Sequence, residues 1–275
     1  MVASKAKPLR SSANAFPREH GAWAILFIPF LTAAVIAGHC TAPVFLALSA
    51  TLLTFVARYP LELLLVPRAY LRAGKPDRVF VRRLVWIYGA LAAAFGLFLV
   101  AHWKFYQLLL LAFVGGLLAG ERIRSARQGA NRRLFAELAG AFGLSLSALV
   151  AWVAATGGLG SRGWLVWALN AAFFGCGILY VKSRIRARLA HRPAGAGDLA
   201  GATIALHFAV AIFVLGLVWF GWIAPLVVVP FALAAVRAAW GLTTKQKWLS
   251  LPRLGWSEVA LSLLFAAFLI LGFHR

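Results

Sequence analysis

The feature that most constrains the fold of this chain is a series of long apolar segments separated by short basic ones. A helix needs about 20 consecutive, predominantly apolar residues to cross a bilayer. Nine segments come near or exceed that length: 21–38, 43–66, 84–101, 105–120, 134–155, 164–181, 199–219, 223–240 and 254–273. The sequence therefore predicts an all-α fold, a polytopic membrane helical bundle of about nine transmembrane helices.

Composition excludes the two alternatives to a membrane protein. Of the 275 residues, 63% are hydrophobic and 13% are charged, against about 45–50% and about 25% in soluble globular domains. A disordered chain needs low hydrophobicity, which is the opposite of this composition. The gaps between the apolar segments are no longer than one short helix, so we expect a single integral membrane domain over residues 1–275, with 1–20 as a cytoplasmic tail.

The formal charge of +21 would indicate nucleic-acid binding in a soluble protein. Here the positive charges come in short runs between apolar segments, which is typical of the cytoplasmic loops of membrane proteins, so we expect no nucleic-acid partner. The loops and tail on one side carry 23 Lys and Arg, whereas the other side has only Lys104, Arg162 and Arg275. This asymmetry predicts a multi-pass protein of the cytoplasmic membrane with its N-terminus inside.

The first apolar segment is a membrane helix rather than a signal peptide by our interpretation. Segment 21–38 contains Pro29 and ends without an A-x-A-like cleavage site. Glu-containing starts at 19–23 and 137–142, and basic ends at 55–58 and 180–184, are compatible with two parallel halves, 21–133 and 134–253, followed by an extra helix at 254–273. Chance explains so few matches equally well.

The acidic residues carry most of the information about a site. Five glutamates lie at or near the predicted inner ends of the segments: Glu19, Glu62, Glu121, Glu137 and Glu258. Ionisable groups in a membrane are costly and usually face a bundle interior or a water-filled cavity. The sequence therefore predicts a polar chamber open to the cytoplasm, which Lys182, Arg184 and Arg237 would also reach. The alternative is that these side chains form ion pairs between helices.

Other polar residues add candidates at the same depth or deeper. Arg58 and Glu62 are spaced i, i+4, so an ion pair within one helix is expected. Asn170 and His207 lie deeper, where a lone His is more often hydrogen-bonded than bound to a metal. Residues 181–192 place basic side chains around an apolar stripe, which predicts a short amphipathic helix on the inner surface, either an anchor on anionic lipid or a lid over a phosphate.

Several motifs resemble the YwiC-like family of bacterial membrane proteins. The opening, Arg18-Glu19-His20-Gly21-Ala22-Trp23, is the most specific of them. Looser matches are the context of Glu137, the run from Tyr180 to Arg186, and the ending Leu254-Gly255-Trp256-Ser257-Glu258. The resemblance covers the chain from end to end and implies no particular activity.

The overall plan is also similar to the UbiA superfamily of intramembrane prenyltransferases, which implies a UbiA-like architecture. Those enzymes hold an isoprenyl diphosphate through Mg²⁺ with two Asp-rich motifs, in the loops after the second and sixth spans. The corresponding loops here have only Asp77 and Asp198. Because carboxylates supply most protein ligands of Mg²⁺ in such sites, the resemblance supports the fold more than the reaction.

Two hypotheses for function follow. The first is a UbiA-like transferase acting on an isoprenoid or lipid phosphate, with Glu19 and His20 as a catalytic proton-transfer pair. The second is a non-catalytic carrier or an accessory protein of a respiratory complex.

The lipid bilayer and an isoprenoid or anionic lipid are the expected partners. No cofactor is identified, and Cys40 and Cys176, on different segments, indicate neither a disulfide nor a metal cluster. The candidate ligand-binding residues are Arg58, Glu62, Glu137, Asn170, Lys182, Arg184, Arg186, Arg237 and Glu258.

Overall fold

The computed structural model describes residues 20–128, 133–189, 198–243 and 251–273, and these ranges contain only helices and the turns between them. Helices lie at all nine predicted segments, in two successive pieces at 134–155 and at 223–240. In chain order they are α1 His20–Ala37, α2 Ala42–Leu65, α3 Pro67–Arg72, α4 Arg78–Trp103, α5 Gln107–Gln128, α6 Arg133–Ser145, α7 Ser147–Thr156, α8 Ser161–Leu189, α9 Asp198–Trp219, the 3-10 turn η3 Pro225–Val227, α10 Val228–Thr243 and α11 Leu251–Phe273.

Seven of these helical segments are long and apolar enough to cross a membrane: α2, α4, α6 with α7, α8, α9, η3 with α10, and α11. The apolar part of α1 is shorter, Gly21–Ala37, and α5 carries Glu121, Arg122, Arg124 and Arg127 in its last turns. The prediction of a helical, multi-pass membrane protein is therefore confirmed.

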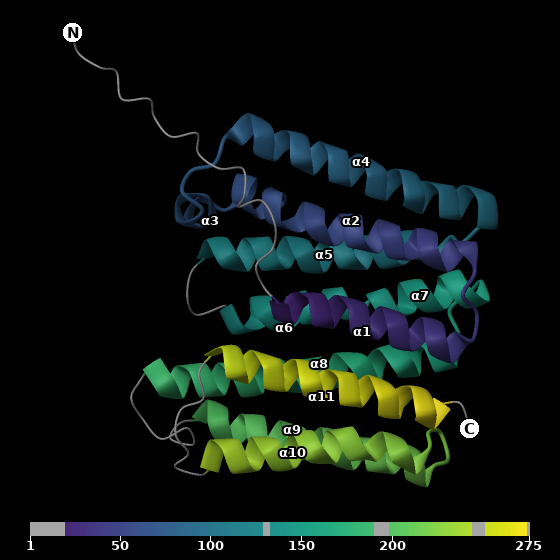
Figure 1. The fold of residues 1–275 in the computed structure, drawn as a ribbon, viewed down its shortest axis with the longest axis vertical. Helices are drawn as coiled ribbons and strands as arrows, with labels where there is room; N and C mark the ends of the chain where they lie inside the picture. Colours follow the sequence, from purple (N-terminus) through teal and green to yellow (C-terminus); the bar gives the residue numbers. More distant parts are fainter. Residues whose placement is uncertain (1–19, 129–132, 190–197, 244–250, 274–275) are drawn as a thin grey trace.

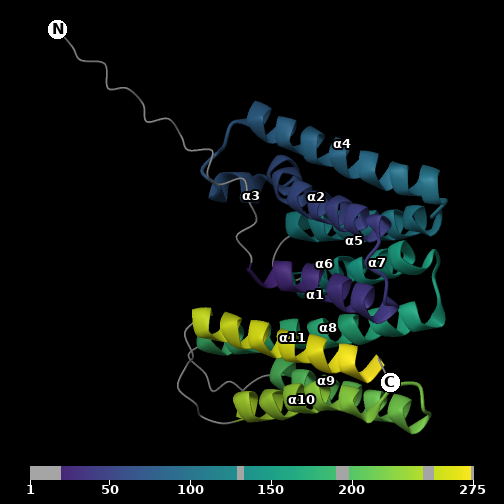
Figure 2. The ribbon, with the colours of Figure 1, turned by 45° about the vertical axis from the view of Figure 1, so that its right-hand side comes forward.

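The helices lie side by side with their axes roughly aligned, in a bundle extended along one direction (Figures 1 and 2). One edge is α4, which packs on α2, and the other is formed by α9 and α10. Between them, α1 packs against α7, α8 and α11, and α5 packs against α6. The C-terminal ends of α2, α5, α8 and α10 all lie at the same end of the bundle, on the left in Figure 1.

The centre of the bundle is formed by α7 and α8. In the apolar windows, 61% of the residues of the α6–α7 segment and 56% of those of α8 are buried, against 6% for α4. The rings of Phe173 on α8 and Phe265 on α11 stack with their centroids 4.1 Å apart, and Phe231 of α10 meets both edge-on. Helix α8 thus contacts both halves of the molecule, whereas α4 leaves most of its surface to lipid.

Helix α8 also changes one expectation. Residues 181–189, which the sequence assigned to a separate helix on the inner surface, are the last turns of α8; residues 190–192 of that prediction lie outside the described ranges. No proline interrupts the chain between Ser161 and Leu189. Contacts of residues 182–184 with neighbouring helices hold this end in the bundle.

Candidate functional site

Three consecutive side chains near the end of α8 contact three different helices. Lys182 lies 2.8 Å from the carboxylate of Glu137 on α6, measured from Nζ to Oε2. The hydroxyls of Ser183 and Thr203, on α9, are 2.9 Å apart, and the buried Arg184 donates from Nη1 to the carbonyl of Gly241 on α10. Successive residues of a helix point about 100° apart, so a run of three polar residues connects α8 to neighbours on several sides.

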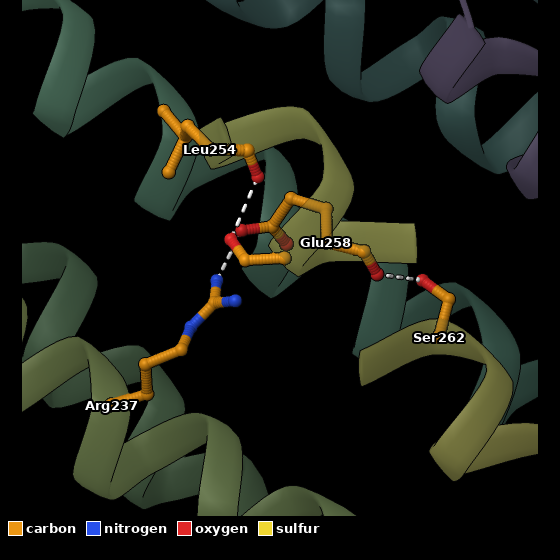
Figure 3. A network of polar contacts seen from close by, with 5 residues as sticks. Arg237, Leu254, Glu258 and Ser262 are labelled. Carbon is orange, nitrogen blue, oxygen red and sulfur yellow. Dashed lines mark hydrogen bonds and ion pairs between the residues drawn. The ribbon is translucent and has the colours of Figure 1, made fainter. Parts of the chain in front are cut away.

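One turn earlier, α8 meets an ion pair between α10 and α11. Arg237 donates from Nη2 to Oε1 of Glu258, and Figure 3 shows the two side chains meeting across the gap between their helices. The guanidinium carbon of Arg237 lies 4.2 Å from the centre of the Tyr180 ring, a cation–π contact with α8. The Ser262 hydroxyl donates to the carbonyl of Glu258, 2.7 Å away. The pair therefore joins three helices.

Two glycines make room for these side chains. A Cβ at Gly241 would lie 2.5 Å from the Tyr180 hydroxyl oxygen, and one at Gly177 would lie 3.3 Å from Oε2 of Glu258. The first distance is shorter than any normal contact, so no larger residue fits at position 241 without a shift of Tyr180. We call the residues Glu137, Tyr180, Lys182, Ser183, Arg184, Thr203, Arg237, Gly241 and Glu258 the polar layer.

A second group of charges lies between α2, α5 and α6. Glu62 of α2 is 3.8 Å from Nη2 of Arg122 on α5, close enough for an ion pair but beyond a direct hydrogen bond. Glu121 accepts from Arg124, 2.6 Å away, and from Ser125, 2.9 Å away, both on its own helix. The expected partner of Glu62 was Arg58, whose guanidinium carbon lies 5.1 Å from the centre of the Phe55 ring.

The remaining candidates lie apart from both groups. Asn170 is fully buried and donates to Thr32 of α1 at 3.2 Å and to the carbonyl of Val166 at 2.9 Å. Arg186 is exposed. Glu19 lies outside the described residues, and His20 begins α1 but its side chain is also outside them.

The geometry gives no support to a carboxylate-lined chamber. Glu62, Glu137 and Glu258 each pair with a basic side chain of another helix, which is the alternative that the sequence left open. The described pocket of about 420 Å³ lies elsewhere, at the junction of α2 and α3 beside the end of α5. Within the described ranges, no three His, Cys, Asp or Glu side chains are grouped as ligands of a metal ion.

Several contacts of the polar layer escaped sequence reasoning. Tyr180 and Ser183 were noted only as part of a run that matches the YwiC-like family. Nothing in the sequence marked Thr203 or Gly241 as site residues, since Thr and Gly are common in membrane helices. His207, expected to be hydrogen-bonded, lies with Nδ1 2.7 Å from the carbonyl of Thr203.

Comparison with known proteins identifies one relation. Residues 16–152, about half of the chain, match the model of the YwiC-like protein family. No curated protein and no solved structure matches the chain. The matched part runs from the segment before α1 to α7 and thus includes α2, α3, α4 and α5, but only Glu137 of the polar layer.

Proposed function

We propose that this chain, a YwiC-like protein through its residues 16–152, is a membrane protein that binds the phosphate group of an isoprenoid or other anionic lipid at one end of its bundle. In this proposal the protein is a binding or accessory component of the bacterial cytoplasmic membrane. The N-terminus and the phosphate-binding end face the cytoplasm, as the distribution of Lys and Arg indicates.

The observation that carries the proposal is the surplus of positive charge at that end, which we call the basic end. It comprises exposed Arg and Lys side chains in and just after α3, at the beginning of α4 and at the ends of α5 and α8. They are Arg68, Arg72, Lys75, Arg78, Arg82, Arg83, Arg124, Arg127, Arg186 and Arg188. The opposite end has Lys104 and Arg162 among the described residues. Juxtamembrane basic residues attract anionic lipid by about 1 kcal/mol each.

The acidic residues near the basic end leave this surplus in place. Glu62, Glu137 and Glu258 are engaged by Arg122, Lys182 and Arg237, none of which belongs to the basic end. Glu121 pairs with Arg124. Asp77 caps α4 by accepting from the backbone N–H of Val79 at 3.0 Å. The charges that remain exposed are therefore mostly positive and suit a phosphate group.

The same engagement argues against the transferase alternative. A diphosphate held through Mg²⁺ needs carboxylates that are available to the metal. Asp77 serves as a helix cap, the glutamates are paired, and the side chain of Asp198 lies outside the described residues. The carboxylates that the structure describes do not fit a Mg²⁺–diphosphate site, so we derive no transfer step.

A carrier is the second candidate, because α8 has a buried polar atom without a partner. Oδ1 of Asn170 is buried and accepts no hydrogen bond from the described residues, while its Nδ2 bonds to Thr32, one turn beyond Pro29 of α1. Polar groups beside a helix-breaking residue near the midplane are typical of transport sites. Loss of transport with normal lipid binding in an Asn170→Leu variant would favour this candidate.

Glu19 and His20 remain a proposal within this function, as a pair that exchanges a proton at the basic end. The test is complementation of a deletion strain by Glu19→Gln and His20→Ala variants, with membrane abundance measured. Loss of function at normal abundance supports a direct role, and full complementation by both variants removes the pair from the site.

The experiment on the proposed function is a lipid titration of the purified full-length protein, followed by native mass spectrometry. The probes are a polyprenyl phosphate, phosphatidylglycerol and zwitterionic phosphatidylcholine. We expect the two anionic lipids to bind about tenfold more tightly than phosphatidylcholine, a difference of about 1.4 kcal/mol. Equal affinity for all three would overturn the proposal. A prenylated product missing from the lipids of a deletion strain would instead favour the transferase.

A further inference from the structure

One pocket lies at the basic end and is lined by residues of α2, α3 and α5 and of the junction between α2 and α3. Figure 2 shows the ribbons of these three helices. The pocket has a volume of about 420 Å³ and is lined by Leu65, Val66, Pro67, Arg68, Ala126 and Arg127. Four of these residues are apolar and two are arginines, which is a composition suited to an amphipathic molecule.

The chain builds this groove by breaking a helix. Pro67 has no N–H to continue the hydrogen bonds of α2, and Val66 before it is extended, with φ −114° and ψ 103°. The carbonyl of Leu65 accepts instead from Nε of Arg127, 2.8 Å away on α5. This bond between distant parts of the chain fixes Arg127 against the broken end of α2 and forms one wall of the groove.

The two arginines keep donors for a ligand. Arg68 and Arg127 are both exposed, and in the described part of the chain Nε is the nitrogen that Arg127 uses. The nearest carboxylates along the two helices are committed: Glu62 pairs with Arg122, and Glu121 accepts from Arg124 and Ser125. Guanidinium groups bind phosphate oxygens through short, charge-assisted hydrogen bonds.

We infer that this groove binds one lipid that carries a phosphate group, with Arg68 and Arg127 on the phosphate and the apolar lining against the first part of its hydrocarbon chain. The inference rests on the proposed function and assigns a site to it. Charge complementarity selects the phosphate, and the position at the end of a membrane-spanning helix selects a lipid over a soluble anion. The groove belongs to the segment that matches the YwiC-like family.

The test repeats the lipid titration on two charge-matched variants. Arg68→Gln removes one of the two guanidinium groups without touching the bond from Arg127 to Leu65. Arg83→Gln removes the same charge at the basic end but from α4, outside the groove lining. We expect Arg83→Gln to lower the affinity for a polyprenyl phosphate by at most about fivefold, the effect of one juxtamembrane charge. Arg68→Gln should lower it roughly thirtyfold, because it also removes charge-assisted hydrogen bonds to the phosphate.

The outcomes separate this inference from the proposed function. If the unaltered protein prefers anionic lipid and both variants lose the same amount, binding is spread over the basic end and the groove is the wrong site, while the proposed function stands. If the unaltered protein shows no preference, both fall. Displacement of the lipid by an equal concentration of inorganic phosphate would show that the apolar lining does not contribute to binding, and would overturn the assignment of a lipid to the groove. The double variant Arg68→Gln with Arg127→Lys removes both guanidinium groups of the groove and should lose most of the preference for the polyprenyl phosphate. Its thermal stability is measured in parallel.

Discussion

Charged side chains play different parts in the two regions of this molecule. In α8, α10 and α11 they form hydrogen bonds between helices. Arg237 bonds to the carboxylate of Glu258, and Arg184 bonds to the backbone carbonyl of Gly241. In α2 and α5 the contact between helices is looser, with Glu62 and Arg122 3.8 Å apart. Arg68 of α3 and Arg127 of α5 remain exposed. Charges of the first kind hold helices together, and charges of the second kind are available to a ligand.

The loss of the Glu258 carboxylate should have the largest effect. Glu258→Gln removes the carboxylate beside the guanidinium of Arg237, whose buried Nε and Nη1 have no hydrogen-bond partner among the described residues. We expect a loss of roughly 1.5–3 kcal/mol in the free energy of unfolding, measured by chemical denaturation in detergent. The matched change Glu62→Gln in the region of α2 and α5 should lose less than about 1 kcal/mol, because Glu62 lies 3.8 Å from Arg122, beyond a direct hydrogen bond. Equal losses in the two variants would erase the contrast between the regions.

A methyl group added at Gly241 should have the next largest effect. Gly241→Ala places a Cβ 2.5 Å from the Tyr180 hydroxyl oxygen, and overpacking of this kind costs about 1–3 kcal/mol. Tyr180→Phe removes the clashing oxygen, so the double variant should recover most of the loss in thermal unfolding. A double variant no more stable than Gly241→Ala would show that α8 and α10 do not meet as described.

The smallest effect is expected at Asn170. Asn170→Leu removes the bond to Thr32, and hydrogen bonds between membrane helices contribute about 0.6 kcal/mol on average. The variant also removes a buried oxygen that has no partner, so the two effects offset each other. We expect a change within about 1 kcal/mol, read from the same denaturation curves. A loss as large as that of Glu258→Gln would show that the contact of Asn170 with α1 stabilises the fold as much as the polar layer does.

The sequence predicted the helices well because lipid makes an apolar run of sufficient length nearly unambiguous. Each predicted segment contains a helix, and the errors lie at the ends, as where α8 runs on to Leu189 through residues read as a separate helix. Charged residues cannot mark the end of a membrane helix when neighbouring helices supply their partners, as Glu137 does for Lys182.

The partners within the candidate site were less predictable for the same reason. Local spacing pointed from Glu62 to Arg58, whereas the ion pair that the structure places at Glu62 is with Arg122, on another helix. Such pairings depend on which helices are neighbours, and the sequence fixes this only through packing over the whole bundle. Gly241 illustrates the limit, because its small size matters only once Tyr180 lies against it.

The most direct test of the account is the increase in Tm that a polyprenyl phosphate produces in three proteins: the unaltered chain, Glu258→Gln, and Arg68→Gln with Arg127→Lys. A ligand that binds the folded state stabilises it according to its concentration and affinity. The account predicts a similar increase in the unaltered chain and in Glu258→Gln, although the latter unfolds at a lower temperature. It predicts a much smaller increase in the double arginine variant. An increase that survives in the arginine variant but disappears in Glu258→Gln would place the ligand in the polar layer and contradict the account.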